Sequence, residues 1–308
     1  MLLFIICQVL TPLTISVNTV NISCMNIHPA LTVLIPLIIV LAFIAAIAGL
    51  WPAEGHPYQA TSLRGESVTI HARGLYYWDT VSSAAQMQAN DLVTLALAVP
   101  LLILAFLLAQ KGSLRGMFLL TGNLGFILYT YITMCFGAHF NRLFLVYVAL
   151  FGLSLFAFIL CLMSFDINKL PEIFTPKLPR SWIAGLLFFT AAFLTMAWGG
   201  RIAAALAPGA VPALDNTTSM FIQALDLAVI VPVCIIAGIL LLRQHPWGYL
   251  LSAVGLVKFT TLGIAVSLMG LNMARIGVPI SLVELTIFPA MAFAGICITI
   301  SLLLHVKQ

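Results

Sequence analysis

Residues 30–51 read ALTVLIPLIIVLAFIAAIAGLW and contain no charged side chain. A helix of about 20 apolar residues is long enough to cross the hydrocarbon core of a bilayer. Further segments of the same character follow at 91–110, 116–136, 143–164, 182–206, 219–242, 247–271 and 281–304. This pattern predicts an all-α, polytopic membrane helix bundle of about eight transmembrane helices.

The composition of the whole chain agrees with this prediction. Of its 308 residues, 62% are hydrophobic and only 7% are charged, whereas soluble domains have about 25% charged residues. The net charge of +4 arises from few charges of either sign, so no basic patch forms. We therefore expect membrane lipids as partners and no nucleic acid. A membrane protein partner or a homo-oligomer stays open.

Four segments follow from this pattern. Residues 1–29 are an N-terminal apolar segment without the basic start of a signal peptide, and we favour an interfacial segment over an extra span or a start-site artefact. Residues 30–164 form a first membrane half. Residues 165–180 contain three prolines and are typical of a linker. Residues 181–308 form a second membrane half.

The distribution of Lys and Arg predicts the orientation. Seven basic residues lie in alternate connections and at the C-terminus, and five lie on the opposite side. Cytoplasmic connections are enriched in basic residues. We therefore expect a cytoplasmic C-terminus, a cytoplasmic 165–180 linker and an outer loop at 52–90.

The outer loop 52–90 is the largest segment expected outside the membrane. Its residues Ser67–Ile70 suit a short strand, and Tyr76, Tyr77 and Trp78 suit an interfacial anchor next to the membrane. We expect the loop to lie on its own bundle. A lid or a ligand-capture element is the alternative interpretation.

A comparison of the two halves indicates a duplication. An offset of 132 residues aligns Val99-Pro100 with Val231-Pro232 and Arg115-Gly116 with Trp247-Gly248. Such matches are short, and apolar helices align easily. We nevertheless keep open an arrangement of two parallel repeats of four helices, since parallel repeats are common in transporters.

Three charged residues lie inside the apolar segments, Asp226, Lys258 and Glu284, whereas almost all other charges lie at segment ends or in loops. A charge in the bilayer core costs about 2.5–3.5 kcal/mol on insertion scales, so it requires a partner, water or a function. Asp226 and Lys258 belong to consecutive antiparallel helices, and we expect them to be coupled as a pair. The alternatives are an ion or proton path and a buried pair that only fixes helix register. For Glu284 we favour a position at the membrane interface.

Further polar residues complete the candidate site. Asn123 and Tyr147 lie within the third and fourth spans, where helix–helix hydrogen bonding is the common role. Pro232 lies six residues after Asp226, where it can break the helix beside the acid. The candidate polar site therefore comprises Asp226, Lys258, Glu284, Asn123 and Tyr147.

The sequence lacks the residue patterns that are typical of several function classes. None of the six histidines lies in the middle of a predicted span, and no metal-ligand spacing is present. The six cysteines are scattered singly. No nucleophile or phosphate-binding motif occurs. We expect no metal and no cofactor, and a membrane-embedded enzyme is the least favoured function class because a catalytic constellation is missing.

Six strings in the chain carry a family resemblance: GLYYWD (74–79), NDLVTL (90–95), KGSLRG (111–116), LFLVYVALFGLSLFA (143–157), LDLAVIVP (225–232) and RQHPWGYLL (243–251). The chain resembles a functionally uncharacterised family of bacterial multi-pass membrane proteins over about residues 65–260. The resemblance implies the bacterial cytoplasmic membrane and supplies neither a substrate nor site residues.

These observations favour a transporter-like or channel-like protein with a polar site near Asp226 and Lys258. The alternative is a non-transporting membrane scaffold, assembly partner or sensor that uses its outer loop. A cavity that reaches the polar residues would favour the first, and sealed packing around them would favour the second.

Overall fold

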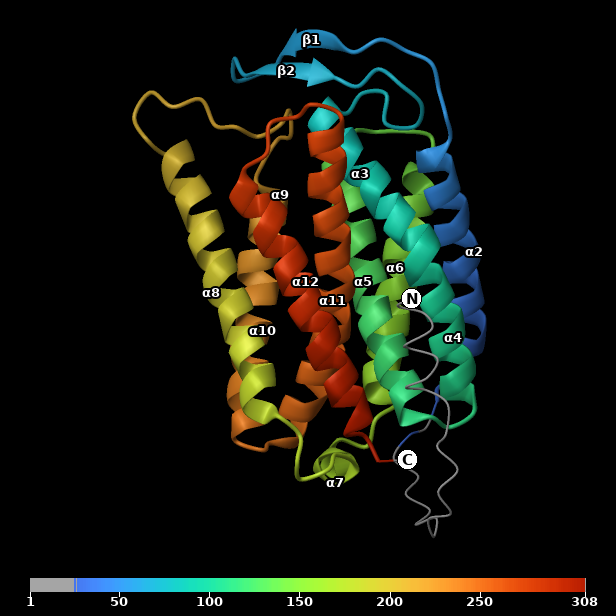
Figure 1. Ribbon diagram of the computed structural model, residues 1–308. Helices are drawn as coiled ribbons and strands as arrows, with labels where there is room; N and C mark the ends of the chain where they lie inside the picture. The colour runs from blue at the N-terminus through green and yellow to red at the C-terminus, as the bar shows by residue number, and fades with distance from the viewer. Residues whose placement is uncertain (1–24, 26, 308) are drawn as a thin grey trace.

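The computed structural model describes residue 25 and residues 27–307, and within them the fold is an all-α membrane bundle (Figure 1). Eight helices in this part of the chain are long and apolar enough to cross a membrane. The predicted fold class is confirmed, and the protein is a multi-pass integral membrane protein. Its elements are α2 (Leu31–Leu50), β1 (Tyr58–Thr61), β2 (Ser67–Ile70), α3 (Val81–Val93), η1 (Thr94–Ala98), α4 (Val99–Gln110), α5 (Leu114–Gly137), α6 (Phe144–Met163), η2 (Ile167–Lys169), α7 (Leu170–Ile173), α8 (Arg180–Ala205), α9 (Phe221–Leu225), η3 (Asp226–Ile230), α10 (Val231–Leu242), α11 (Pro246–Arg275) and α12 (Leu282–Leu304).

The bundle has two distinct ends. Figure 1 shows β1 and β2 above one end and α7 at the other, next to the C-terminus; we call these ends the hairpin face and the α7 face. Exposed tryptophans occur near both, Trp51 and Trp78 towards the hairpin face and Trp182 and Trp247 at the helix starts on the α7 face. Tryptophan is enriched at both membrane–water interfaces, so these residues mark the two membrane boundaries. The predicted N-terminal segment 1–29 lies mostly outside the described residues.

Seven of the eight spans begin and end within a few residues of their predicted bounds, and the second span is the exception. It begins at Val81 rather than at 91 and continues through η1 to Gln110. The side chain of Thr80 caps the helix by accepting a hydrogen bond from the Ser83 backbone N–H. The first turns of this helix contain polar residues, including Asn90 and Asp91, that are buried against the bundle. A search for apolar segments therefore places the start of the span too late. The connection before the second span therefore ends at residue 80.

The predicted strand at Ser67–Ile70 is confirmed. It pairs antiparallel with β1, with Tyr58 opposite Ile70. The loop that carries this hairpin contacts the connection between α8 and α9: the Arg64 guanidinium donates to the Thr218 carbonyl at 3.2 Å, and Glu66 accepts from the backbone N–H groups of Leu214 and Asp215. The prediction that the loop lies on its own bundle is confirmed.

The proposed offset of 132 residues also relates two unusual backbone features. η1 and η3 are both single π-helical turns, and residue 94 plus the offset is residue 226, so they begin at matching positions. Each is followed by a Val-Pro pair at the start of the next α-helix. A π-turn inserts one residue into a helix and often lies at a functional site.

The turn between α4 and α5 matches the turn between α10 and α11 at the same offset. Gly112 and Gln244 both have positive φ, and the next residues, Ser113 and His245, both cap the following helix with their side chains. The backbone N–H of Ser113 donates to the Leu108 carbonyl, and that of His245 donates to the Leu240 carbonyl. The second and third helices of the two halves are thus locally equivalent. The full four-helix repeat stays a prediction.

The two halves differ where their first and fourth helices meet. In the first half, α2 packs directly against α6. In the second half, α8 packs mainly against α10 and only sparsely against α12. The space between α8 and α12 is occupied by a cavity.

The α7 face is closed by aromatic packing. Phe165 and Phe174, from the segment between α6 and α8, pack on Phe118 of α5 with ring centroids 5.0 and 5.7 Å away. Phe174 also stacks on Tyr249 of α11 at 5.3 Å. Val306, which follows α12, forms an isolated antiparallel β-bridge with Phe174. The 165–180 segment is therefore packed into the bundle end rather than only linking two halves.

Candidate functional site

A cavity of about 860 Å³ lies in the second half of the bundle. One face of α8 and one face of α12 form two of its walls, and side chains from α3, α5 and α11 complete them. It extends from Asp226 to the loops of the hairpin face, including residues 213–219. Its volume lies in the range of small-molecule sites in proteins, about 300–1,000 Å³.

Asp226 lines the deep part of this cavity. It is the first residue of the π-turn η3 and is 5% exposed. Its Oδ1 accepts a hydrogen bond from the Tyr129 hydroxyl at 2.8 Å, and its Oδ2 accepts one from Nε1 of Trp198 at 2.9 Å. Residues from α5, α8 and η3 therefore hold this carboxylate in place.

Lys258 lies close to this carboxylate but does not pair with it directly. Its Nζ lies 4.0 Å from the centroid of the Tyr129 ring and 4.8 Å from that of Phe259, and it has no hydrogen-bond acceptor within the described residues. A cation above an aromatic face is attracted by the ring quadrupole. The two ion pairs of the described chain do not include Asp226 or Lys258.

Asp226 and Lys258 therefore form no direct ion pair, and their expected coupling stays a prediction, with Tyr129 lying between the two charges. Its hydroxyl binds the carboxylate while the face of its ring holds the ammonium. Tyr129 and Phe259 line the cavity and Lys258 does not. The two opposite charges are thus connected through one tyrosine.

Glu284 lies at the start of α12, where it forms a capping box with Ser281. Its Oε2 accepts from the Ser281 backbone N–H at 3.0 Å and from the Ser281 hydroxyl at 2.8 Å. It is exposed and lines the cavity near the hairpin face. Glu284 therefore caps α12 at the end of a span, which agrees with the expected position at the membrane interface.

Asn123 and Tyr147 lie away from the cavity. The Asn123 amide donates to the carbonyl of Ala98, the last residue of η1, at 2.7 Å. The ring of Tyr147 packs against Tyr131 with centroids 6.0 Å apart. Of the five predicted site residues, the structure thus brings Asp226 and Glu284 to the cavity, with Lys258 behind its wall.

A second buried acid, Asp91, was not among the predicted site residues. It is 3% exposed and accepts a hydrogen bond from the Tyr76 hydroxyl at 2.5 Å. It fits because Gly49 of α2 has no side chain: a Cβ there would lie 1.8 Å from Oδ2 of Asp91. Tyr76, predicted as an interfacial anchor, is instead buried. Thr80 begins the helix that contains Asp91 by capping it, and this cap was not recognised in the sequence.

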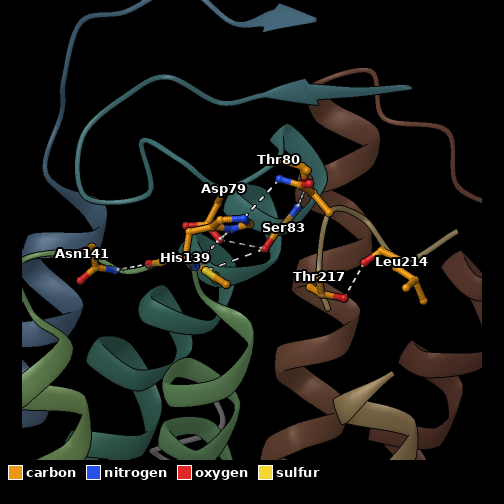
Figure 2. Close-up of polar contacts among 9 residues, drawn as sticks. Asp79, Thr80, Ser83, His139, Asn141, Leu214 and Thr217 are labelled. Carbon is orange, nitrogen blue, oxygen red and sulfur yellow. Dashed lines mark hydrogen bonds and ion pairs between the residues drawn. The ribbon is translucent and has the colours of Figure 1, made fainter. Parts of the chain in front are cut away.

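A polar cluster joins the loops at the hairpin face (Figure 2). Oδ1 of Asp79 accepts from the His139 backbone N–H at 3.0 Å and lies 3.2 Å from His139 Nδ1. His139 Nε2 lies 3.3 Å from Nδ2 of Asn216, on the loop that lines the cavity mouth. The hydrogen bond to Asp79 raises the pKa of His139, although partial burial acts in the opposite direction.

The described cavity wall has more acidic than basic side chains. It contains the carboxylates of Glu66, Asp215, Asp226 and Glu284, against the single guanidinium of Arg201. Burial raises the pKa of Asp215. No cluster of His, Cys, Asp and Glu among the described residues suits a metal ion.

No protein-family model matches the chain, and neither a curated protein nor a solved structure matches it significantly. The resemblance to an uncharacterised bacterial family therefore stays a prediction, and the functional argument rests on the cavity and its residues.

Proposed function

We propose that this protein is a membrane carrier whose substrate site is the cavity between α8 and α12. The observation that carries the proposal is that this cavity extends from the hairpin face into the bundle and reaches the buried carboxylate of Asp226. An intramembrane acid beside a cavity is typical of substrate and ion pathways. A scaffold would instead be expected to seal such a residue by packing.

The structure corresponds to one state of such a carrier. The cavity reaches the loops of the hairpin face, while the rings of Phe165 and Phe174 close the α7 face between Phe118 and Tyr249. Alternating access requires a second state in which this aromatic stack separates and the mouth closes. The topology expected from the basic residues makes the hairpin face the outer one.

A cysteine-accessibility experiment tests the carrier proposal without a known substrate. The native cysteines are replaced, and Thr260→Cys or Ser252→Cys is introduced on α11. Thr260 lines the cavity, whereas Ser252 is fully buried nearer the α7 face, where its hydroxyl donates to the Ala237 carbonyl. A membrane-impermeant thiol reagent is applied separately to each side of sealed vesicles.

A carrier should make Thr260→Cys reactive from the hairpin side and Ser252→Cys slowly reactive from the α7 side. Reaction of Ser252→Cys should accelerate when Phe174→Ala weakens the aromatic stack. A Ser252→Cys that stays unreactive in both backgrounds contradicts the carrier and favours the scaffold or sensor alternative. Rapid reaction of both cysteines from both sides would indicate a channel.

A further inference from the structure

The wall between α8 and α12 is a sparsely packed lateral boundary of the cavity. One aromatic contact bridges the two helices: Phe193 of α8 meets Phe288 of α12 edge to face, with ring centroids 5.7 Å apart. Both rings line the cavity. Pro289 follows Phe288 and interrupts the hydrogen bonding of α12 at this level. This ring pair therefore forms part of the barrier between the cavity and the surrounding lipid.

The helix α8 has little else to hold it against α12. Its packing partner is mainly α10. A Cβ at Gly185, Gly199 or Gly200 would meet nothing within 4 Å, so these positions of α8 do not lie against a neighbour. A small rotation of α8 that separates the two phenyl rings would connect the cavity to the hydrocarbon of the bilayer.

The chemistry of the lining changes along the cavity. Apolar side chains of α8, including Leu186, Leu187 and Leu194, lie on the same wall as Phe193. Asp226 and its donors Tyr129 and Trp198 provide the buried polar end. A ligand that matches both parts has a long apolar portion and one polar head.

The charge on the cavity wall favours a cationic head. Four carboxylates and one guanidinium line the described cavity, and when the ammonium of Lys258 behind the wall is counted, the carboxylates still outnumber the cations by two. Each oxygen of Asp226 accepts one hydrogen bond, from Tyr129 or from Trp198, and has capacity for another. The ring of Trp198 beside it can further stabilise a cation, whereas the ring of Tyr129 already holds Lys258.

We propose that the cavity binds an amphiphile with a primary ammonium head and an apolar tail, and that this ligand enters from the bilayer between Phe193 and Phe288. The ammonium pairs with Asp226, and the tail lies along the apolar face of α8. This inference rests on the proposed carrier function for its biological use, but the binding itself requires no transport.

Binding of radiolabelled dodecylammonium to the purified full-length protein in lipid nanodiscs tests the site, with protein-free nanodiscs as background. Saturable binding is expected, and Asp226→Asn should weaken it by about tenfold or more, because it removes the charge and keeps the shape. Asp91→Asn is the matched control, since Asp91 is also buried and bound by a tyrosine but lies outside the cavity lining. Dodecanol and dodecyl sulfate carry the same tail and should compete poorly.

The absence of saturable binding to the wild-type protein would overturn the proposal, and so would equal binding to the Asp226→Asn variant or equal competition by dodecyl sulfate. Should Asp226→Asn fail to fold, Thr190→Trp serves as a second variant, because it fills the cavity from α8 without removing a charge. Retained binding to folded Thr190→Trp would likewise overturn the site.

The lateral entrance is tested with Phe193→Cys and Phe288→Cys in a protein without other cysteines, joined by a short reducible cross-linker. Association of dodecylammonium should slow by about tenfold or more on cross-linking and recover on reduction. An unchanged association rate would overturn the lateral route. If Ser252→Cys reacts from the α7 side but dodecylammonium does not bind, the protein is a carrier for another substrate. If dodecylammonium binds but Ser252→Cys stays unreactive, the protein is an amphiphile receptor that does not transport.

Discussion

At the scale of single residues, Tyr129 determines how the two buried charges interact. Its hydroxyl binds the carboxylate of Asp226, and the face of its ring holds the ammonium of Lys258. A buried charge that loses its partner is costly, whereas removal of both charges is often tolerated. The arrangement therefore predicts energetic coupling between two residues that do not touch.

We expect Asp226→Asn and Lys258→Met each to lower thermal stability, and the double variant to recover part of the loss. The interaction free energy should lie in the range of about 0.5–3 kcal/mol typical of coupled residues. Thermal unfolding of the purified variants in detergent measures it. The pair Asp91→Asn with Lys258→Met is the control and should be additive, because Asp91 is bound by Tyr76 instead. Additive losses for Asp226 and Lys258 would show that Tyr129 does not transmit the coupling.

His139 predicts a pH dependence of stability at the hairpin face. Its folded pKa is raised above the reference of 6.5, first by the hydrogen bond to Asp79. Its stabilising contribution is therefore fully present below about pH 6.5 and is lost as the pH rises through the folded pKa. Thermal unfolding across this pH range should show His139→Gln destabilising the protein more at low pH than at high pH. If His139→Gln destabilises the protein equally at low and at high pH, the charge of the imidazole does not contribute to stability.

At the scale of elements, two glycines allow consecutive antiparallel helices, α4 with α5 and α10 with α11, to pack closely where they are joined. A Cβ at Gly116 would lie 2.5 Å from Leu108 of the preceding helix, and a Cβ at Gly248 would lie 2.2 Å from the backbone nitrogen of Leu241. Gly116 and Gly248 occupy matching positions at the 132-residue offset. The same close approach is thus used twice.

Gly116→Ala and Gly248→Ala should therefore both destabilise the protein, although alanine in a helix interior is ordinarily favoured over glycine by about 1 kcal/mol. Gly185→Ala is the matched control, because nothing lies within 4 Å of its added Cβ, and it should be neutral or stabilising. Thermal unfolding midpoints give the comparison. A stabilising effect at Gly116 or Gly248 would show that the two helices of the pair can move apart without a loss of stability.

At the scale of the whole molecule, the bundle combines one closed and one open half. The first half is closed where α2 meets α6, and the second is open where α8 and α12 are separated by the cavity. The connection between α8 and α9 and the loop around β1 and β2 then meet over the cavity mouth through Arg64 and Glu66. The proposed substrate path consequently lies in the second half alone.

The orientation of this bundle in the membrane is a prediction that labelling can test. Leu63→Cys, on the fully exposed tip of the hairpin, should react with an impermeant thiol reagent in intact cells. Gln110→Cys, exposed at the α7-face end of α4, should react only after lysis. The basis is the excess of basic residues on the α7 face. The reverse pattern would place the cavity mouth towards the cytoplasm.

The features that depend on local composition could be predicted before the structure was known. Apolar length fixed the number of spans, because a segment in lipid must satisfy its own backbone hydrogen bonds. Ser67–Ile70 suited a short strand. The two Val-Pro pairs indicated an internal match, but the π-turns that precede them were not predicted. Asp226 and Lys258 were recognisable as buried charges because charge is rare in a span.

The contacts between helices could not be predicted in this way, because they depend on the rotation of each helix relative to its neighbours. Nothing in the sequence near Asp226 indicates that Tyr129 from α5 and Trp198 from α8 donate to it. The burial of Asp91 likewise required Tyr76 and the missing side chain of Gly49. The cavity itself arises from the separation of α8 and α12. Hydropathy cannot encode that separation, since an apolar side chain is equally well solvated by lipid and by another helix.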